Sequence, residues 1–156
     1  MKKLILLALV CTFQFSDLNA QQISDYLFGQ NMWLTEGAEG RTGYIDKLWP
    51  KVKKSGAAMI RIGGNGYNKN MPSYDTLTKW VRAIKDIGAE PLMQVSQQDT
   101  PEASEQLVPY FNKDKATRIT HWYIGNEPYH MAKMTVDSIS AFIKAHATAM
   151  KAADPT

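Results

Sequence analysis

The sequence predicts an α/β fold built from successive strand–helix units, and two observations carry this prediction. Four short apolar segments recur at a spacing of about 30 residues, with amphipathic helical patterns between them. Two of these helical patterns end in glycine, and each glycine is followed directly by alanine and an apolar segment. A chain that alternates in this way folds as βαβ units around a parallel sheet.

The four expected strands are rich in β-branched and bulky residues and are bounded by glycine, asparagine or serine, as buried parallel strands are. They are Tyr26–Trp33, Ala57–Ile62, Ala89–Val95 and Thr120–Ile124.

Helices are predicted where apolar residues recur three and four positions apart. Ser73 and Thr100 are expected N-caps, and Pro101 fits the first helical position, where a missing N–H costs nothing. The four apolar stripes are Ile45–Val52, Leu77–Ile87, a weaker one through Ala103, Leu107 and Phe111, and a long one over Val136–Ala153.

Two architectures repeat strand and helix in this way, the doubly wound open sheet and the eightfold barrel. A (β/α)8 barrel typically needs about 250 residues, and this chain supplies four units. Its last residues, 152–156, resemble a helix end that turns toward a fifth strand. We therefore expect four βα units of a TIM barrel, truncated before strand five.

The first 20 residues have the pattern of a bacterial signal peptide. Lys2 and Lys3 precede an apolar run of about 12 residues, which is shorter than the roughly 20 that span a bilayer, and Ala20 ends a cleavage site. We expect residues 21–156 to be exported to the periplasm, cell surface or medium. A lipid anchor at Cys11 is disfavoured by Val10 but stays open.

Charge and cysteine content narrow the function classes. The formal net charge is +3, with no basic cluster that would indicate nucleic-acid binding. The only cysteine lies within the expected signal peptide, so residues 21–156 can form neither a disulfide nor a catalytic thiolate.

Polar and aromatic residues follow the expected strands at their carboxyl ends, where the chemistry of parallel α/β folds is located. Amides, one arginine, one carboxylate and several rings suit a sugar, because rings stack on its C–H faces while amides bond its hydroxyls. The set comprises Asn31, Trp33, Arg61, Gly63, Gly64, Asn65, Tyr67, Gln94, Ser96, Gln97, Asn126, Glu127, Tyr129 and His130.

Two stretches resemble a known family. The sequence W-Y-I-G-N-E-P, residues 122–128, resembles the Asn-Glu-Pro motif that closes strand four in the clan A glycoside hydrolases. These retaining (β/α)8 enzymes include cellulases, xyloglucanases, mannanases and xylosidases. The sequence M-I-R-I-G-G-N, residues 59–65, is similar to the end of their strand two. The resemblance covers residues 21–156 as strands one to four with their helices.

The resemblance implies roles for matching residues. Glu127 corresponds to the general acid/base, Asn126 to the group that binds the sugar 2-hydroxyl, and Arg61 to the residue that orients the nucleophile. We expect Asn65, Trp33 and Tyr129 to help bind a polysaccharide or oligosaccharide. A general acid must hold its proton near the working pH, so we expect Glu127 in a partly apolar, water-poor setting.

The catalytic nucleophile is not assigned. Retaining hydrolysis needs a second carboxylate about 5 to 5.5 Å from the first, and in the family it comes from strand seven. Several acidic residues lie at the correct end of the expected strands, but no motif marks them. These acidic residues are Glu36, Glu39, Asp99, Glu102 and Glu105, whereas Glu90 begins strand three at the wrong end. The expected partner is the C-terminal half of the barrel, and this fragment alone is expected to be inactive.

Two other function classes stay open. One is a non-catalytic carbohydrate-binding or scaffold protein with a barrel-derived fold. The other is a small nucleotide-binding α/β domain, which is disfavoured because the glycines at 63–66 lack the G-x-G-x-x-G spacing and the next helix is expected only near Ser73.

Neither a cofactor nor a metal is expected. Glu127 and His130 have the Glu-x-x-His spacing of helical metal sites, but Pro128 is incompatible with a helix interior.

Several residues have structural interpretations that compete with a functional one. Trp122 is expected to pack against the helices, and His146 to be a satisfied core histidine on an apolar stripe. Arg61 has a structural ion pair as its alternative role, Trp33 a place in the top layer of the barrel core, and Glu127 that of a loop carboxylate or helix cap.

Overall fold

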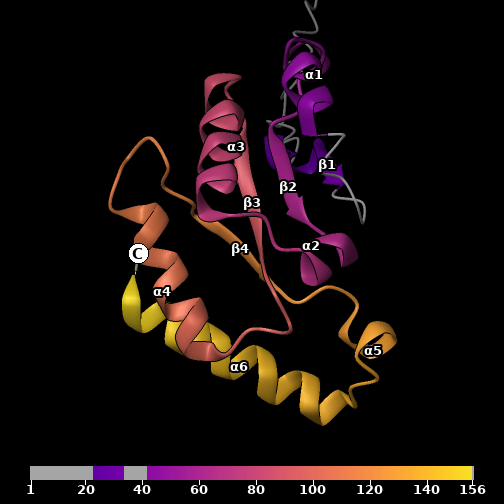
Figure 1. Cartoon of the computed structure of the whole chain (residues 1–156), viewed down its shortest axis with the longest axis vertical. Coiled ribbons are helices and arrows are strands. Elements are labelled where there is room, and N and C mark those ends of the chain that lie inside the picture. The colour runs from indigo at the N-terminus through magenta and orange to yellow at the C-terminus, as the bar shows by residue number, and fades with distance from the viewer. Residues whose placement is uncertain (1–22, 34–41, 156) are drawn as a thin grey trace, which may run out of the picture.

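The computed structural model describes residues 23–33 and 42–155 and has an α/β fold with one four-stranded parallel sheet. The expected signal peptide lies outside the described residues. The elements, labelled in Figure 1, are the 3-10 helix η1 (Asp25–Leu27), β1 (Gly29–Trp33), α1 (Thr42–Ser55), β2 (Met59–Gly63), α2 (Asn65–Lys69), α3 (Tyr74–Asp86), β3 (Glu90–Val95), α4 (Pro101–Asn112), β4 (His121–Ile124), α5 (Pro128–Met131) and α6 (Val136–Ala153).

The strands lie in the sheet in the order of the chain. The order is β1-β2-β3-β4 and each neighbouring pair is parallel, so no strand in the described sheet reverses the winding. A doubly wound sheet reverses its order at a switch point, whereas successive right-handed crossovers in one direction place their helices on one face. The observed order is therefore that of consecutive βα units.

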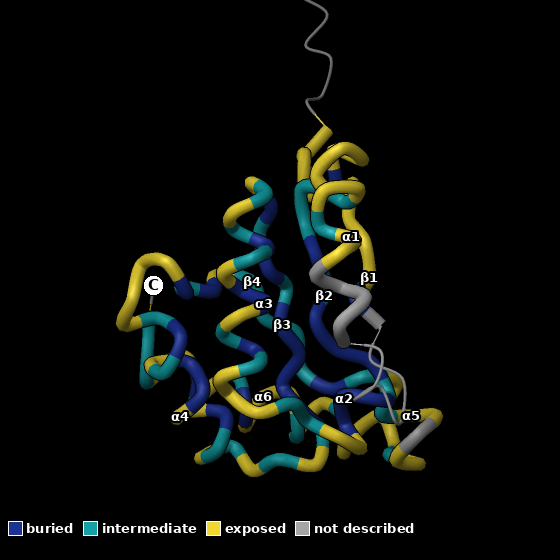
Figure 2. The backbone as a smooth tube through the Cα atoms, turned by 45° about the horizontal axis from the view of Figure 1, so that its top comes forward, coloured by how far each residue is buried: buried dark blue, intermediate teal, exposed yellow. Residues whose placement is uncertain are grey.

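The two faces of the sheet differ in chemistry. Ile60, Ile62 and Met93 point to the helices, are at most 2 % exposed and belong to one core cluster with α3 and α4. The other face carries Arg61 and Gln94, which alternate with these apolar residues along β2 and β3. Figure 2 shows the buried segments along β2 and β3. The apolar core thus lies between the sheet and the helices, and the polar side chains of β2 and β3 lie on the opposite face, which we call the polar face.

Local sequence signals for helix ends are confirmed. The Ser73 side chain accepts a hydrogen bond from the Thr76 amide at 3.3 Å, and Thr100 accepts one from Ala103 at 3.2 Å. Gly56 has a φ of 73°, the left-handed conformation that glycine adopts after a helix without a steric cost.

Several boundaries differ from the prediction, those of β2, β3 and β4 by one or two residues, and the short helix α5 was not predicted. Tyr26 and Leu27 lie in η1 rather than in strand one, because Ser24 caps the Tyr26 amide and closes a turn there. The short helix α2 follows Gly64 directly, although no helix was predicted before Ser73. The Tyr67 side chain is fully buried and anchors α2 in the core, which a search for helical periodicity cannot detect in five residues.

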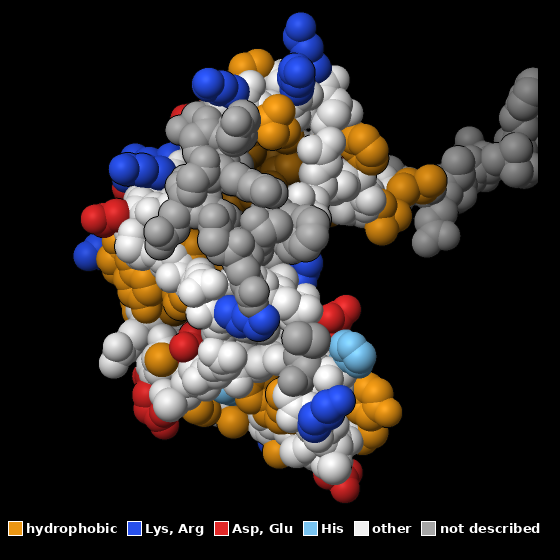
Figure 3. All heavy atoms as spheres, turned by 45° about the vertical axis from the view of Figure 1, so that its right-hand side comes forward, with side chains coloured by type: hydrophobic (Ala, Val, Ile, Leu, Met, Phe, Trp, Pro, Cys, Tyr) orange, Lys and Arg blue, Asp and Glu red, His pale blue; other side chains and the backbone are white. Residues whose placement is uncertain are grey.

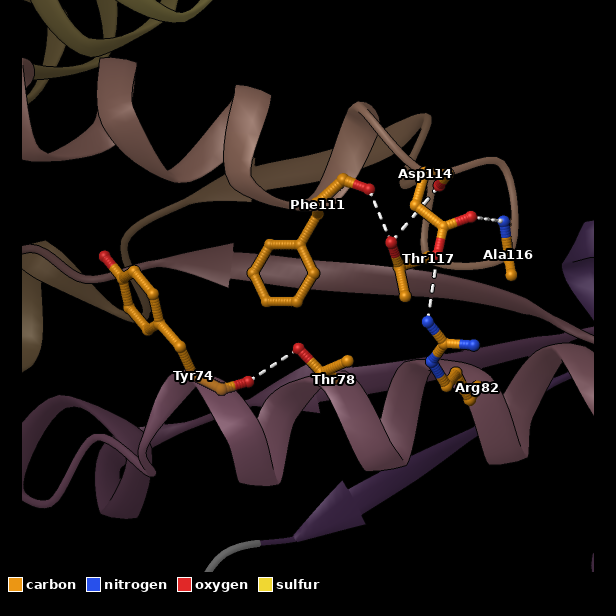
Figure 4. A network of polar contacts seen from close by, with 7 residues as sticks. All are labelled: Tyr74, Thr78, Arg82, Phe111, Asp114, Ala116 and Thr117. Carbon is orange, nitrogen blue, oxygen red and sulfur yellow. Dashed lines mark hydrogen bonds and ion pairs between the residues drawn. The ribbon is translucent and has the colours of Figure 1, made fainter.

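The connection from α4 to β4 is fixed by hydrogen bonds, shown in Figure 4. Thr117 is buried, and its hydroxyl donates to the Phe111 carbonyl at 2.8 Å. Asp114 accepts a hydrogen bond from the Ala116 amide at 2.9 Å and pairs with Arg82 of α3 at 2.9 Å. This loop sets the position from which β4 enters the sheet.

Helix α6 packs along α4 through His146, as predicted for a satisfied core histidine. The His146 ring is 2 % exposed, its Nδ1 lies 2.7 Å from the Ser104 hydroxyl, and the Phe142 ring lies 4.4 Å away. Burial lowers the pKa of His146, while the negative charges of Asp99 and Glu102 act in the opposite direction. The N-terminal part of the α6 stripe differs from the prediction, since Val136 is 75 % exposed.

Apolar grooves flank both edge strands of the sheet. A cavity of about 250 Å³ lies beside β4, where Trp122 and Ile124 face Val108 and Met150. A second cavity, of about 220 Å³, lies beside β1 against α1 and is lined by Trp49 among others.

Further apolar side chains are exposed where the described chain begins, among them Ile23, Leu27 and Phe28 (Figure 3). In the described residues, no helix has both the length and the apolar character to cross a membrane.

Candidate active site

The carboxyl ends of β2, β3 and β4 meet closely at Gly63. A Cβ atom placed on Gly63 would lie 1.8 Å from the Tyr123 hydroxyl and 2.5 Å from Gln94 Oε1. No side chain larger than hydrogen fits there without displacing its neighbours. The glycine therefore lets side chains from β3 and β4 close over the end of β2.

Gln94 is the buried hub of this region. Its Oε1 accepts hydrogen bonds from the Gly64 amide at 2.6 Å and from the Tyr123 hydroxyl at 2.7 Å. Its Nε2 donates to Asn68 Oδ1 at 2.6 Å. Burial raises the pKa of Tyr123 to about 12, against an opposing effect of Arg61. The phenol therefore stays neutral and continues to donate to Gln94. Gln94 in turn holds the start of α2 in place, because it accepts a hydrogen bond from the Gly64 amide.

Arg61 lies half-buried on the polar face of the sheet. Its guanidinium donates to Asn31 Oδ1 at 3.3 Å and to Asn126 Oδ1, and it lies 4.6 Å from the centre of the Tyr123 ring. Within the part of the chain that the structure describes, no carboxylate pairs with Arg61. In the described residues, two amide oxygens and one aromatic ring surround the guanidinium.

A strained turn follows β4. Gly125 donates its N–H to the Val95 carbonyl at 2.9 Å, and the Asn126 N–H donates to Gln97 Oε1 at 2.7 Å. Glu127 then adopts left-handed backbone angles, φ 48° and ψ 48°, before Pro128 begins α5. This conformation costs a residue with a Cβ roughly 1–2 kcal/mol, and such strain is concentrated at functional sites.

Four of the predicted site residues are connected by hydrogen bonds. Arg61 donates to Asn126, the Asn126 Nδ2 donates to Asn65 Oδ1 at 2.8 Å, and the Asn65 Nδ2 donates to Glu127 Oε2 at 3.2 Å. We call these four residues the polar relay. Side chains that are 61 to 65 positions apart in sequence thus meet at one edge of the sheet.

Glu127 is exposed in the described chain, which differs from the water-poor setting that was predicted. The reason is that β4 is an edge strand of the sheet, so nothing in the described residues covers the side of Glu127 that faces away from β3. Tyr129 is 73 % exposed on α5 and makes no described contact with the polar relay.

Trp33 cannot be placed in the site. Its backbone pairs with Gly63 in the β1–β2 register, but its side chain lies outside the described residues. Glu36 and Glu39 lie outside them as well. Trp122 packs against the helices as predicted, with its ring 6.4 Å from that of Phe111.

Two residues grouped with the strand-end set are core residues instead. Tyr67 is fully buried, burial raises the pKa of its hydroxyl, and that hydroxyl has no hydrogen-bond partner among the described atoms. Ser96 is 3 % exposed and caps the Gln98 amide. Neither is placed to meet a sugar.

The site is also built by Gln94 and Gln97, which were predicted only as members of the strand-end set, and by Tyr123, which was not predicted. All three lie at or just after the carboxyl ends of β3 and β4, and Gln94 shares the polar face of the sheet with Arg61 and Tyr123. Counting alternate residues back from the end of β4 could have identified Tyr123.

A nucleotide loop is not favoured by the geometry of residues 63–66. The Gly64 amide, which such a loop would turn toward phosphate, is bonded to Gln94. Among the described residues there is also no group of three or more metal-ligating side chains.

No protein-family model matches the chain, and no curated protein sequence matches it significantly.

Proposed function

We propose that this chain forms the acid/base side of a secreted, retaining β-glycoside hydrolase with a (β/α)8 barrel. The observation that carries the proposal is the polar relay, which joins Glu127 at the carboxyl end of β4 to Arg61 and Asn126. These are the three residues to which the Asn-Glu-Pro resemblance gives roles in catalysis.

Each group has a chemical task in the proposed reaction. Glu127 protonates the glycosidic oxygen as the bond breaks and later removes a proton from the attacking water. The Asn126 amide uses one N–H on Asn65 and has a second N–H for the sugar 2-hydroxyl. Arg61 brings positive charge beside the place where a second carboxylate would stand, and it has no carboxylate partner among the described residues.

The rest of the barrel would complete the site. Within the described residues, the four-stranded sheet has two unpaired edges, with one apolar groove beside β1 and another beside β4. Four further βα units would pair with both edges, fill both grooves and place a wall beside Glu127. That wall would supply the water-poor setting and the nucleophile, a carboxylate about 5 to 5.5 Å from Glu127.

The proposal has a direct genetic and enzymatic test. We expect the gene to continue past the codon for Thr156 with four more βα units and a glutamate at the end of the seventh strand. The complete protein should hydrolyse a β-linked glycan, and Glu127→Gln should lower kcat by about 10²-fold or more. Glu105→Gln, at an exposed position on α4, is the matched control and should keep full activity. Full turnover by Glu127→Gln contradicts the proposal.

A non-catalytic carbohydrate-binding protein is the second candidate. It is favoured by the exposed Tyr129 ring, because an exposed aromatic face can stack on a sugar. In that case the complete protein binds a glycan with an affinity that Glu127→Gln leaves unchanged and Tyr129→Ala weakens. Turnover of the same glycan would exclude this candidate.

A further inference from the structure

The direction of the hydrogen bonds in the polar relay is fixed by chemistry. A guanidinium can only donate, so the Asn126 atom that faces Arg61 must be its carbonyl oxygen. The Asn126 amide nitrogen then faces Asn65 and makes the facing atom of Asn65 an acceptor. The remaining end of the Asn65 carboxamide, its NH₂ group, is left facing Glu127. Arg61 therefore determines the orientation of both amides.

This orientation has a consequence for the Glu127 carboxyl group. Oε2 receives an N–H from Asn65 at 3.2 Å, and a proton on Oε2 would compete with that N–H for the same region. The neutral acid is thus favoured with its proton on Oε1. We propose that Asn65 is a positioning residue that fixes Oε1 as the oxygen that donates and accepts the proton, with its orientation relayed from Arg61 through Asn126.

The reaction steps balance with one oxygen serving both of them. The Oε1 proton moves to the glycosidic oxygen as the bond from that oxygen to the anomeric carbon breaks and the nucleophilic carboxylate, supplied by the rest of the barrel, bonds to that carbon, leaving Glu127 ionised. In the second step Oε1 takes a proton from water as the water oxygen bonds to the anomeric carbon and the bond from that carbon to the nucleophilic carboxylate breaks. Asn65 donates to Oε2 throughout, so it neither gains nor loses a proton.

Asn65 is well held for this role. The preceding residue, Gly64, is anchored by the hydrogen bond from its amide to the buried Gln94, and Asn65 begins α2. Both ends of its carboxamide are engaged within the protein. The sequence predicted Asn65 as a sugar-binding residue, and we now infer that it acts on the substrate through Glu127.

The inference rests on the proposed hydrolase function and is tested in the complete protein with two β-glycosides. A dinitrophenyl glycoside has a leaving group that departs without a proton, whereas an alkyl glycoside needs the acid. Asn65→Ala should lower kcat/KM by about 10- to 100-fold on the alkyl glycoside and by less than about threefold on the dinitrophenyl glycoside. Asn70→Ala, an exposed asparagine that ends α2, is the matched control and should change neither value.

A second variant tests the direction of the hydrogen bond. Asn65→Asp can still accept from Asn126, but it cannot donate to Glu127 and it adds a negative charge beside that carboxyl group. Like charges disfavour each other's ionisation, so the alkaline limb of the pH–rate profile should move to higher pH. An unmoved limb, in an Asn65→Asp protein that is folded, overturns the inference.

The relay from Arg61 is tested with a double-mutant cycle. Arg61→Met frees the Asn126 amide to turn, so adding Asn65→Ala should cause little further loss on the alkyl glycoside. Multiplicative losses, or equal losses by Asn65→Ala on both glycosides, overturn the relay while leaving the hydrolase proposal intact. An inactive wild-type protein instead refutes the hydrolase proposal itself.

Discussion

Substituting Gly63 by alanine is the sharpest structural test of how the site is held. The new Cβ would lie 1.8 Å from the Tyr123 hydroxyl, and 3.4 Å is the lower end of ordinary contact, so the two atoms must separate by 3.4 − 1.8 = 1.6 Å. Gln94 must also move, since its Oε1 would lie at 2.5 Å. Both residues belong to the hub that holds Gly64 and hence the polar relay.

The expected cost follows from the contacts. Overpacking a well-packed region costs about 1–3 kcal/mol, and each of the two hydrogen bonds to Gln94 Oε1 contributes about 1 kcal/mol. Gly63→Ala should therefore lower the free energy of unfolding by about 4 kcal/mol. That is a large part of the roughly 5–15 kcal/mol that stabilises a typical domain. Urea denaturation of the complete protein, followed by circular dichroism, measures the change.

Two comparisons make the result specific. Gly56→Ala also replaces a glycine with positive φ, at 73°, but nothing lies within 4 Å of its Cβ, so it should cost only about 1 kcal/mol. Tyr123→Phe should destabilise the wild type by about 1 kcal/mol through its lost hydrogen bond, yet stabilise Gly63→Ala by removing the closest atom. A loss below about 1 kcal/mol for Gly63→Ala, or the same sign for Tyr123→Phe in both backgrounds, would refute the reasoning.

Four further predictions concern the turn at Glu127, two titratable residues and the loop before β4. Because Glu127 is left-handed, Glu127→Gly should be more stable than Glu127→Ala by about 1 kcal/mol in urea denaturation; equal stabilities would contradict the strain. Burial holds the pKa of His146 below 6.5, so stability should fall as the pH drops from 6.5 through the lowered value, while His146→Gln should flatten this dependence of the urea midpoint. The contribution of Asp99 to the pH dependence of stability has the opposite sign. Burial raises the pKa of its carboxyl group, so the ionised form destabilises the folded protein, and Asp99→Asn should raise the urea midpoint at neutral pH. In the loop of Figure 4, Thr117→Val should cost about 1 kcal/mol, whereas Arg82→Ala, which removes a half-exposed ion pair, should change the free energy of unfolding by less than about 0.5 kcal/mol; the reverse order would contradict the assignment.

Much of the fold could be predicted because its signals are local. The caps at Ser73 and Thr100 depend on a side chain and an amide three residues away, and apolar periodicity marks the buried side of each long helix. Glu127, Asn126 and Arg61 could be grouped because parallel strands end at the same edge of a sheet. Neither inference needs knowledge of distant contacts.

The remaining features depend on contacts between segments far apart in sequence. The burial of Tyr67, the hub at Gln94 and the capture of the Asn126 amide by Gln97 are set by how loops fold over the sheet. The left-handed backbone of Glu127 could not be predicted either, because the residue before a proline ordinarily prefers an extended conformation. That preference is overridden by the hydrogen bonds on both sides of the turn.

Chemical rescue of Glu127→Ala in the complete protein is the most direct test of Glu127 as the general acid/base. With a dinitrophenyl β-glycoside, the variant should form its covalent intermediate and then stall, because no base activates water. Added azide should restore turnover and give a glycosyl azide with the β configuration of the substrate. Unchanged hydrolysis by Glu127→Ala without azide, or an α-glycosyl azide as the product, would contradict the assignment.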